Sequence, residues 1–332
     1  MKRTFLKYVL LMTISYVCWS GSACAQQNIQ FTQYVFNSLS INPAYAGYKE
    51  EWFAQMALRA QWLGVEGAPK TAVFSIDGIL DPRDRKMGLG FQITSDRIGP
   101  QSANSATVNY AYRLQLDADD TQRLSFGIGA GLAQYTLKGD LLHSIDAGDQ
   151  ALPVGNDSSL KPDIRLGVYY NSNFLYIGAS VTDVFFGPKA ESYASTPTSL
   201  KIDRSRHAYL IAGGLVNLNP DLRLRPSLLI KEDFKGPTSA DLNMMIIIND
   251  KVWVGASYRT DLALWKKQYA DLSKQNSISG VAQFFISERF RLGYSYDYVT
   301  SKLGSSQNGS HELTLGLAFG KVPRSMICPR VF

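Results

Sequence analysis

The strongest constraint on how this chain folds is a two-residue hydrophobic alternation that recurs in segments of about ten residues. In the segment 123–133 every second side chain from Leu124 to Leu132 is apolar, and the residues that follow these are only Ser, Gly or Ala. The segments 106–116, 290–298 and 313–319 show the same period. Because successive side chains of a β-strand point to opposite faces, the pattern predicts strands with one apolar face.

Composition narrows the class of protein further. Of the 332 residues, 45% are hydrophobic, 12% are aromatic and 19% are charged, which excludes a disordered chain. The body of the chain has no apolar run long enough for a membrane-spanning helix, which excludes a helical membrane protein. Abundant aromatic residues together with 27 glycines indicate an all-β chain.

Alternation also occurs in soluble β-sandwiches, so the nature of the two faces decides between the classes. A sandwich exposes a polar face rich in Lys, Glu and Thr. Here the polar face is mostly Gly, Ser, Asn and Arg, and the apolar face carries aromatic residues near strand ends, at Tyr110, Tyr112, Tyr296 and Tyr298. This arrangement is typical of a transmembrane antiparallel β-barrel, whose aromatic girdles lie at the membrane interfaces.

The alternating segments add up to about fourteen strands, and the connections between them differ in length. Every second connection is short, and the others are mostly longer, which predicts short periplasmic turns and long extracellular loops. An even strand count puts both termini of the chain on the periplasmic side, where the short turns lie. The expected strands are 51–63, 71–80, 87–98, 103–116, 123–137, 162–172, 174–185, 206–218, 222–232, 240–249, 251–260, 276–287, 289–300 and 310–320. The expected long loops are 138–161, 186–205, 261–275 and 301–309.

The first 25 residues read as a signal peptide, with three cations, a short apolar stretch and the cleavage pattern Ala23-Cys24-Ala25. Lipidation of Cys24 is the alternative. We therefore expect a signal peptide at 1–25, a periplasmic or plug segment at 26–50, an outer-membrane barrel at 51–320 and a periplasmic tail at 321–332. Without the leader, basic and acidic residues nearly balance, so no nucleic-acid partner is expected.

Several charged residues fall on the polar face of the predicted strands and are expected to point into the lumen. A lipid-facing Arg at the membrane midplane costs about 2–4 kcal/mol, so the inward direction is favoured. Two interpretations stay open, a polar channel or binding lumen, and structural ion pairs across a packed interior. The residues are Arg59, Arg113, Arg165, Arg223, Arg225, Lys231, Arg259, Arg291, Asp77, Asp241, Asp297 and Glu312.

No catalytic or metal-binding pattern is evident. The chain has no G-x-S-x-G, no phosphate-binding loop and no H-E-x-x-H, and its three histidines lie in no recognisable acid–base arrangement. Outside the leader only Cys328 remains, which cannot form an internal disulfide or a cysteine cluster. We therefore expect no enzyme activity, no cofactor and no metal. A lipid-modifying enzyme would need a Ser and a His in hydrogen-bond reach at the rim.

The segment 26–50 is too polar to lie in lipid and too aromatic to be a free tail. We expect it to fold into the periplasmic mouth of its own barrel, where it plugs the lumen or contacts a partner. The alternative is that it merely braces the first strand. The residues expected to do this are Gln33, Tyr34, Phe36, Asn37, Asn42, Pro43, Ala44, Tyr45, Ala46 and Gly47.

The same segment carries the most specific motifs of the chain, which resembles the PorP/SprF family of type IX secretion system outer-membrane proteins of the Bacteroidetes. The resemblance covers essentially the whole mature chain, with departures at Ser38 and Ser40 around Leu39 and at Val331, where Tyr is expected. It rests on the stretches Gln30–Asn37, Asn42–Gly47, Arg59–Trp62, Gly67–Thr71, Gly88–Gly90, His311–Gly316 and Pro329–Phe332.

The resemblance implies a barrel that works with secretion or gliding-motility machinery in the outer membrane. It implies help in the export or surface anchoring of a large secreted adhesin or other type IX cargo. Its partners would be outer-membrane lipid, that cargo and other secretion-system subunits. The alternative is an outer-membrane porin or transporter for a small or hydrophobic solute.

Overall fold

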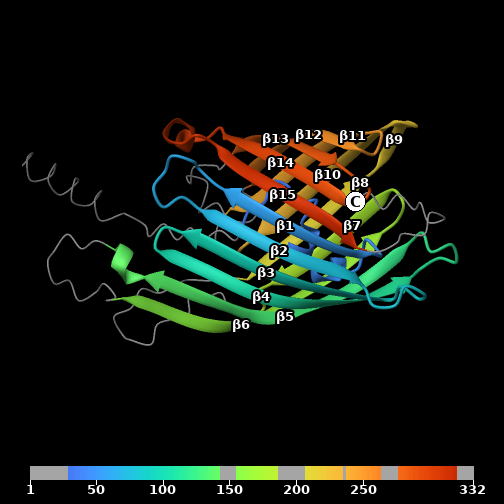
Figure 1. The fold of residues 1–332 in the computed structure, drawn as a ribbon, viewed down its shortest axis with the longest axis horizontal. Helices are drawn as coiled ribbons and strands as arrows, with labels where there is room; N and C mark the ends of the chain where they lie inside the picture. The colour runs from blue at the N-terminus through green and yellow to red at the C-terminus, as the bar shows by residue number, and fades with distance from the viewer. Residues whose placement is uncertain (1–28, 143–154, 186–205, 235–236, 263–275, 320–332) are drawn as a thin grey trace, which may run out of the picture.

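The computed structural model describes residues 29–142, 155–185, 206–234, 237–262 and 276–319, and these form one closed antiparallel sheet (Figure 1). The expected signal peptide, the tail at 321–332 and large parts of three expected long loops (143–154, 186–205 and 263–275) lie outside the described residues. The strands are β1 (Trp52–Ala60), β2 (Lys70–Ile79), β3 (Met87–Ile98), β4 (Gln101–Gln115), β5 (Arg123–Lys138), β6 (Asn156–Asn171), β7 (Leu175–Thr182), β8 (His207–Gly214), β9 (Val216–Asn219), β10 (Leu222–Glu232), β11 (Thr238–Ile248), β12 (Val252–Leu262), β13 (Ser277–Phe285), β14 (Phe290–Val299) and β15 (Ser310–Phe319).

The sheet closes because the last strand pairs with the first. Met56 of β1 lies opposite Leu315 of β15, and the ladder runs from Trp52 opposite Phe319 to Ala60 opposite His311. β8 and β9 both pair with β10 and are separated only by Leu215, so they act as one strand of the barrel. The result is the predicted fourteen-stranded barrel, in which each strand pairs with a neighbour on both sides along at least part of its length.

Strand β6 is several residues longer than the sequence pattern predicts. β6 begins at Asn156 rather than at 162, and its ladder with β5 continues to Lys138 opposite Asn156. The additional residues 156–161 are mostly polar, so they lack the apolar alternation that marks a lipid-facing strand. The hydrogen-bonded ladder extends past the apolar belt here, and hydrophobic periodicity cannot detect that part.

The two ends of the barrel differ in their connections, and we call them the turn end and the loop end. The turn end carries the short connections 80–86, 116–122, 172–174, 220–221, 249–251 and 286–289. The loop end carries the long connections, including 61–69 and 300–309, and also the two-residue link Gly99–Pro100. An outer-membrane barrel places such short turns in the periplasm.

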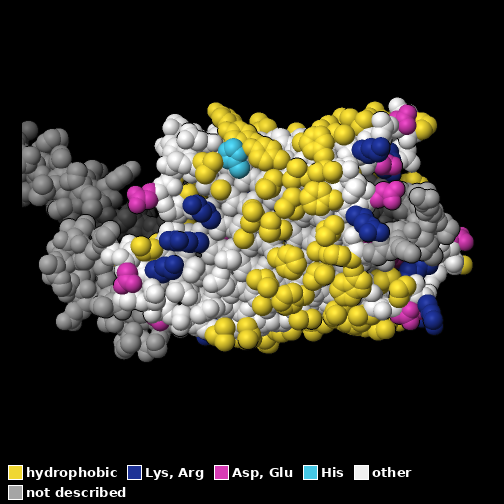
Figure 2. All heavy atoms as spheres, in the orientation of Figure 1, with side chains coloured by type: hydrophobic (Ala, Val, Ile, Leu, Met, Phe, Trp, Pro, Cys, Tyr) yellow, Lys and Arg dark blue, Asp and Glu magenta, His cyan; other side chains and the backbone are white. Residues whose placement is uncertain are grey.

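Burial is the reverse of that in a soluble protein. Large apolar side chains such as Phe74, Ile93 and Ile128 are exposed on the outer face and form the belt in Figure 2, whereas polar side chains fill the interior. Among the described residues, no helix is long and apolar enough to cross a membrane. The outward apolar belt is the surface that meets lipid.

Candidate functional site

Residues 29–50, which we call the lumen segment, lie inside the barrel. The segment contacts both sides of the ring, since its Gln33 bonds to Glu312 on β15 and its Asn42 bonds to Val168 on β6. It contains two short 3-10 helices, η1 (Ser38–Ser40) and η2 (Pro43–Tyr45). The chain enters the first strand from the turn end, so the segment runs from the loop end down to that mouth.

At the loop end, the segment is held by an ion-pair cluster on the closing seam of the barrel. Arg59 of β1 pairs with Asp297 of β14 and, at 2.9 Å, with Glu312 of β15. The Thr32 hydroxyl donates to Asp297 at 2.7–2.8 Å, and the backbone N–H groups of Thr32 and Gln33 donate to Glu312 at 2.8 and 3.1 Å. All five residues are buried, and the uncharged donors of Thr32 and Gln33 supply hydrogen bonds to the two carboxylates.

A second cluster contacts the start of the segment. Asp241 of β11 pairs with Arg259 of β12 and, at 2.6 Å, with Lys231 of β10. Arg259 also donates to the side chain of Gln30 at 3.2 Å and to the carbonyl of Phe31 at 3.3 Å. Residues 30–33 of the lumen segment thus connect the wall formed by β14, β15 and β1 with the wall formed by β10, β11 and β12.

The centre of the segment packs on aromatic and guanidinium groups. The Phe36 ring lies 5.4 Å from the Trp253 ring of β12, centroid to centroid. The guanidinium of Arg225 lies over the same Phe36 ring at 5.7 Å, and that of Arg291 at 5.5 Å. Cation–π contacts of this kind are strongest where both groups are desolvated, as they are here. The Tyr34 hydroxyl lies 3.1 Å from Ser227 of β10.

The motif Asn42–Gly47 fits against glycines of the wall. The Asn42 amide oxygen caps η2 by accepting the N–H of Ala44 at 2.9 Å, and its amide nitrogen donates to Val168 at 2.9 Å. A Cβ on Gly167 of β6 would lie 2.0 Å from that Asn42 oxygen, and a Cβ on Gly127 of β5 would lie 2.1 Å from the Ala44 nitrogen. Side chains at these wall positions would therefore displace the motif.

The end of the motif makes the turn into the first strand. Gly47 has φ +73° and donates its N–H to Asp77 of β2 at 3.0 Å. A Cβ on Gly47 would lie 2.8 Å from the backbone of Gly88, so this position needs glycine for both its conformation and its space. The Tyr45 ring stacks on Tyr48 at 4.9 Å and meets the edge of Tyr169 from β6.

At the turn end, Glu50 organises a group of arginines. Its carboxylate pairs at 3.1 Å with both Arg85 and Arg113, and lies 3.9 Å from Arg123. The pKa of Lys49 is well below its usual range, mainly because the ammonium is buried and secondly because the Arg291 guanidinium is near. The contacts of Glu50 thus hold the end of the lumen segment against the wall at the turn end.

Every charged residue expected on the polar face does lie on the inner face, but not all of them contact the lumen segment. Arg165 pairs with Asp163 of the same strand at 2.7 Å, and Arg223 pairs with Asp250 in a turn. The remaining ones form the clusters described above. Within the described residues, the interpretation as structural ion pairs therefore fits better than an open polar channel.

Sequence reasoning missed several residues that hold the segment. Thr32 and Glu50 lie in the lumen segment, where no local pattern marks them as contacts. Arg123 is the first residue of β5, so the alternation of that strand does not mark it. The wall glycine Gly127 is part of the alternating face of the segment 123–133, but the sequence does not reveal what packs against it or against Gly167. A glycine on the inner face leaves space for another part of the chain. That space can be interpreted only when the lumen segment is known to fill it.

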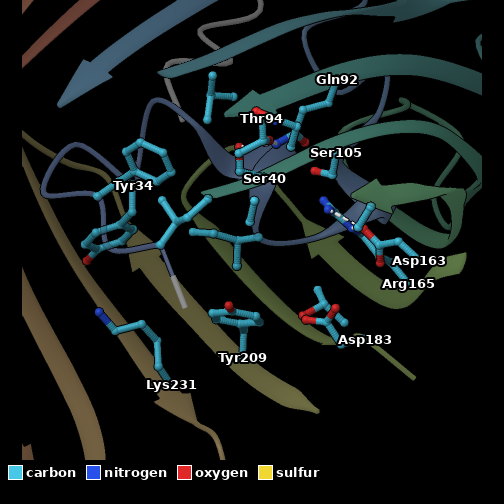
Figure 3. Close-up of a pocket in the computed structure, with 18 of the residues that line it drawn as sticks. Tyr34, Ser40, Gln92, Thr94, Ser105, Asp163, Arg165, Asp183, Tyr209 and Lys231 are labelled. Carbon is cyan, nitrogen blue, oxygen red and sulfur yellow. Dashed lines mark hydrogen bonds and ion pairs between the residues drawn. The ribbon is translucent and has the colours of Figure 1, made fainter. Parts of the chain in front are cut away.

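A cavity of about 70 Å³ remains between the lumen segment and the wall in the loop-end half (Figure 3). Tyr34 and Ser40 border it from the segment, and the wall contributes polar side chains. The Asp163 Oδ1 and Gln92 Oε1 atoms are buried and have no hydrogen-bond partner among the described residues, so the cavity has room and acceptors for water. The labelled wall residues are Gln92, Thr94, Ser105, Asp163, Arg165, Asp183, Tyr209 and Lys231.

Within the described part of the chain, no group of three or more His, Cys, Asp or Glu side chains is arranged to hold a metal ion. Two of the three histidines lie at the loop end. His207 lies 3.6 Å from Asp183 inside the barrel, and His311 lies 2.6 Å from the Tyr294 hydroxyl on the outer face.

Comparisons with known proteins agree with this geometry. A family model described as type IX secretion system membrane protein PorP/SprF matches residues 23–317. Among solved structures, the CymD monoaromatic hydrocarbon channel is similar with a TM-score of 0.53 and 12% identity, over 86% of this chain and 93% of that chain. The outer membrane protein Omp33 of Acinetobacter baumannii is similar with a TM-score of 0.48 and 9% identity, over 81% and 98% of the two chains. A search of curated proteins found no match.

Proposed function

The chain belongs to the PorP/SprF family of type IX secretion system membrane proteins, and on this basis we propose that it is a plugged barrel that assists export or surface anchoring of a large secreted protein. The family and the porin-like barrel place the chain in the outer membrane. The proposed role is not enzymatic. Its partners are the secreted cargo, an adhesin among the candidates, and other subunits of the secretion or gliding machinery.

The observation that carries the proposal is the occupied lumen. The lumen segment is bonded to strands on both sides of the ring and is buried along most of its length. A solute channel needs a continuous water path, whereas a scaffold for secretion benefits from a closed barrel that does not leak. The many buried polar and aromatic side chains of the lumen segment therefore support the role as a closed scaffold.

The second candidate is a porin or transporter. The similarity to the CymD channel, at 12% identity, concerns the fold alone. The cavity beside the lumen segment is the observation that favours this candidate, because it is partly lined by polar side chains and lies in the loop-end half. At about 70 Å³ it holds a few water molecules at most, which argues against passage of a solute.

The first test is deletion of the gene, followed by a census of large proteins at the cell surface and in the medium. We expect one large secreted protein to be lost or released, with no slower entry of small solutes. Unchanged surface proteins together with slower solute entry would instead identify a porin. Complementation with the wild-type gene is the control.

The second test addresses the plug. Replacing Tyr34, Phe36 and Tyr45 together by Ala removes the apolar anchors of the lumen segment. We expect a barrel that still inserts but conducts ions in planar bilayers or loses its partner. Replacing the exposed Phe174 of a turn by Ala is the control and should change neither. Failed insertion would support a brace instead, and normal conductance with normal export would refute the plug.

A further inference from the structure

A row of positively charged or polar side chains faces outward at the loop end of one side of the barrel. Lys70 of β2 lies directly opposite Arg97 of β3, and both side chains are exposed. The same cross-strand row continues through Ala60 to His311 in one direction and to Ser102 in the other. The neighbouring residues along each strand point inward, so the row belongs to the lipid-facing side.

The pairing of two cations is unfavourable by itself. Like charges directly opposite each other on neighbouring strands lie about 5 Å apart and destabilise the sheet. Neither Lys70 nor Arg97 forms an ion pair with any residue that the structure describes. The nearest acid on β3, Asp96, points inward and accepts a hydrogen bond from Thr71 at 2.5 Å. An anion from outside the chain would relieve this repulsion.

The height of the row matches the headgroup region of a membrane. The last fully apolar row of the belt here contains Phe74 and Ile93, which are 43% and 46% exposed. Lys70 and Arg97 stand four residues further along their strands, which is about 13 Å along the strand and about 10 Å in height at the usual barrel tilt. A row of small polar side chains, including Ser95 and Asn104, separates the two levels.

Figure 2 shows the same arrangement on the surface, with Lys and Arg side chains gathered between the apolar belt and the loop-end rim, and acidic side chains only further out. His311 adds a hydrogen-bonding group beside them. If its Nδ1 accepts the Tyr294 hydroxyl, its proton resides on Nε2, which then serves as a donor. The Tyr296 ring, 5.1 Å from the His311 ring, supports its position.

We propose that Lys70 and Arg97, assisted by His311, bind a phosphate group of the glycolipid that forms the outer leaflet of the outer membrane. A guanidinium matches the geometry of a phosphate and an ammonium adds a second charge. Since the site lies on the lateral face at headgroup depth, its neighbour is a lipid rather than a soluble anion. The site is independent of the lumen and of any role in export.

The test is native mass spectrometry of the full barrel, purified in detergent and incubated with bisphosphorylated lipid A or with the same lipid after dephosphorylation. We expect wild-type protein to retain the phosphorylated lipid. The variant Lys70→Gln/Arg97→Gln should bind it about thirtyfold more weakly, because each cation near a charged lipid surface contributes roughly a factor of five. Arg83→Gln/Lys86→Gln at the turn end is the matched control and should bind as the wild type does.

Three results would overturn the proposal. Equal retention by the Lys70/Arg97 variant and the wild type would show that these cations are not the site. Equal retention of dephosphorylated lipid A would show that the phosphate is not recognised. Displacement of the lipid by millimolar inorganic phosphate would identify a general anion site. Heat-modifiable gel migration verifies that each variant is folded, so loss of binding is not loss of structure.

Discussion

The carboxylate of Glu312, near the start of the last strand, accepts the backbone N–H of Thr32 at 2.8 Å, and both residues are buried. They are 280 positions apart in the sequence. Glu312 also pairs with Arg59 of the first strand, so one carboxylate joins the first strand, the last strand and the lumen segment. Closure of the barrel and docking of the segment therefore stabilise each other.

The first prediction concerns this carboxylate. Glu312→Ala leaves two N–H groups of the segment without an acceptor and removes one of the two carboxylates that pair with Arg59. We expect a loss of about 3 kcal/mol in the free energy of unfolding, because removal of one partner leaves a buried charge and donors poorly compensated. Urea unfolding in lipid vesicles, followed by Trp fluorescence, measures it. Glu288→Ala in an exposed turn is the control, and equal stability of both variants would contradict the coupling.

The second prediction concerns the fit between the wall and the lumen segment. Gly167→Val places a side chain where the Asn42 amide lies, so we expect the segment to leave its site while the barrel still forms. Protease accessibility of residues 29–50 should then rise at least tenfold. Gly280→Val is the matched control, since a Cβ there meets nothing within 4 Å. Unchanged protection in Gly167→Val would mean that the segment tolerates a shifted position.

The third prediction concerns the lipid-facing side. Leu315→Arg puts a charge on the outward face of the last strand, at a cost of about 2–4 kcal/mol if the residue lies near the midplane. We expect heat-modifiable migration on gels to be lost or greatly reduced. Leu315→Ile keeps the apolar surface and should migrate as the wild type does. Normal folding of the Arg variant would show that this face does not contact lipid.

The fourth prediction concerns orientation. Small epitope tags inserted at Asp149 and Lys267, in the expected long loops, should be labelled on intact cells. A tag in the turn at 220–221 should be labelled only after the outer membrane is opened, because short turns of such barrels are periplasmic. Labelling of the turn tag on intact cells, without labelling of the loop tags, would invert the assignment.

Much of the wall could be predicted from the sequence, because side-chain alternation is a local property. The period of two specifies which face of each strand is apolar, and lipid outside demands an apolar outer face. Strands such as β3, expected at 87–98, match the structure residue for residue. The prediction was wrong where the chemistry no longer alternates, as at the start of β6, where only pairing with β5 maintains the strand.

The inward direction of Arg59 and Glu312 also followed from the sequence, because a charge in lipid is costly. The partners of Arg59 and Glu312 could not be predicted from the sequence. Ion pairing across the seam, the bonds from Thr32 and the fit of Asn42 against Gly167 depend on residues that are far apart in the chain. The sequence by itself determined the barrel and which face of each strand is apolar. Both depend on the local two-residue period and on the lipid that surrounds the barrel. The tertiary structure alone decided what fills the lumen, because only closure of the ring brings the two walls and residues 29–50 within contact distance.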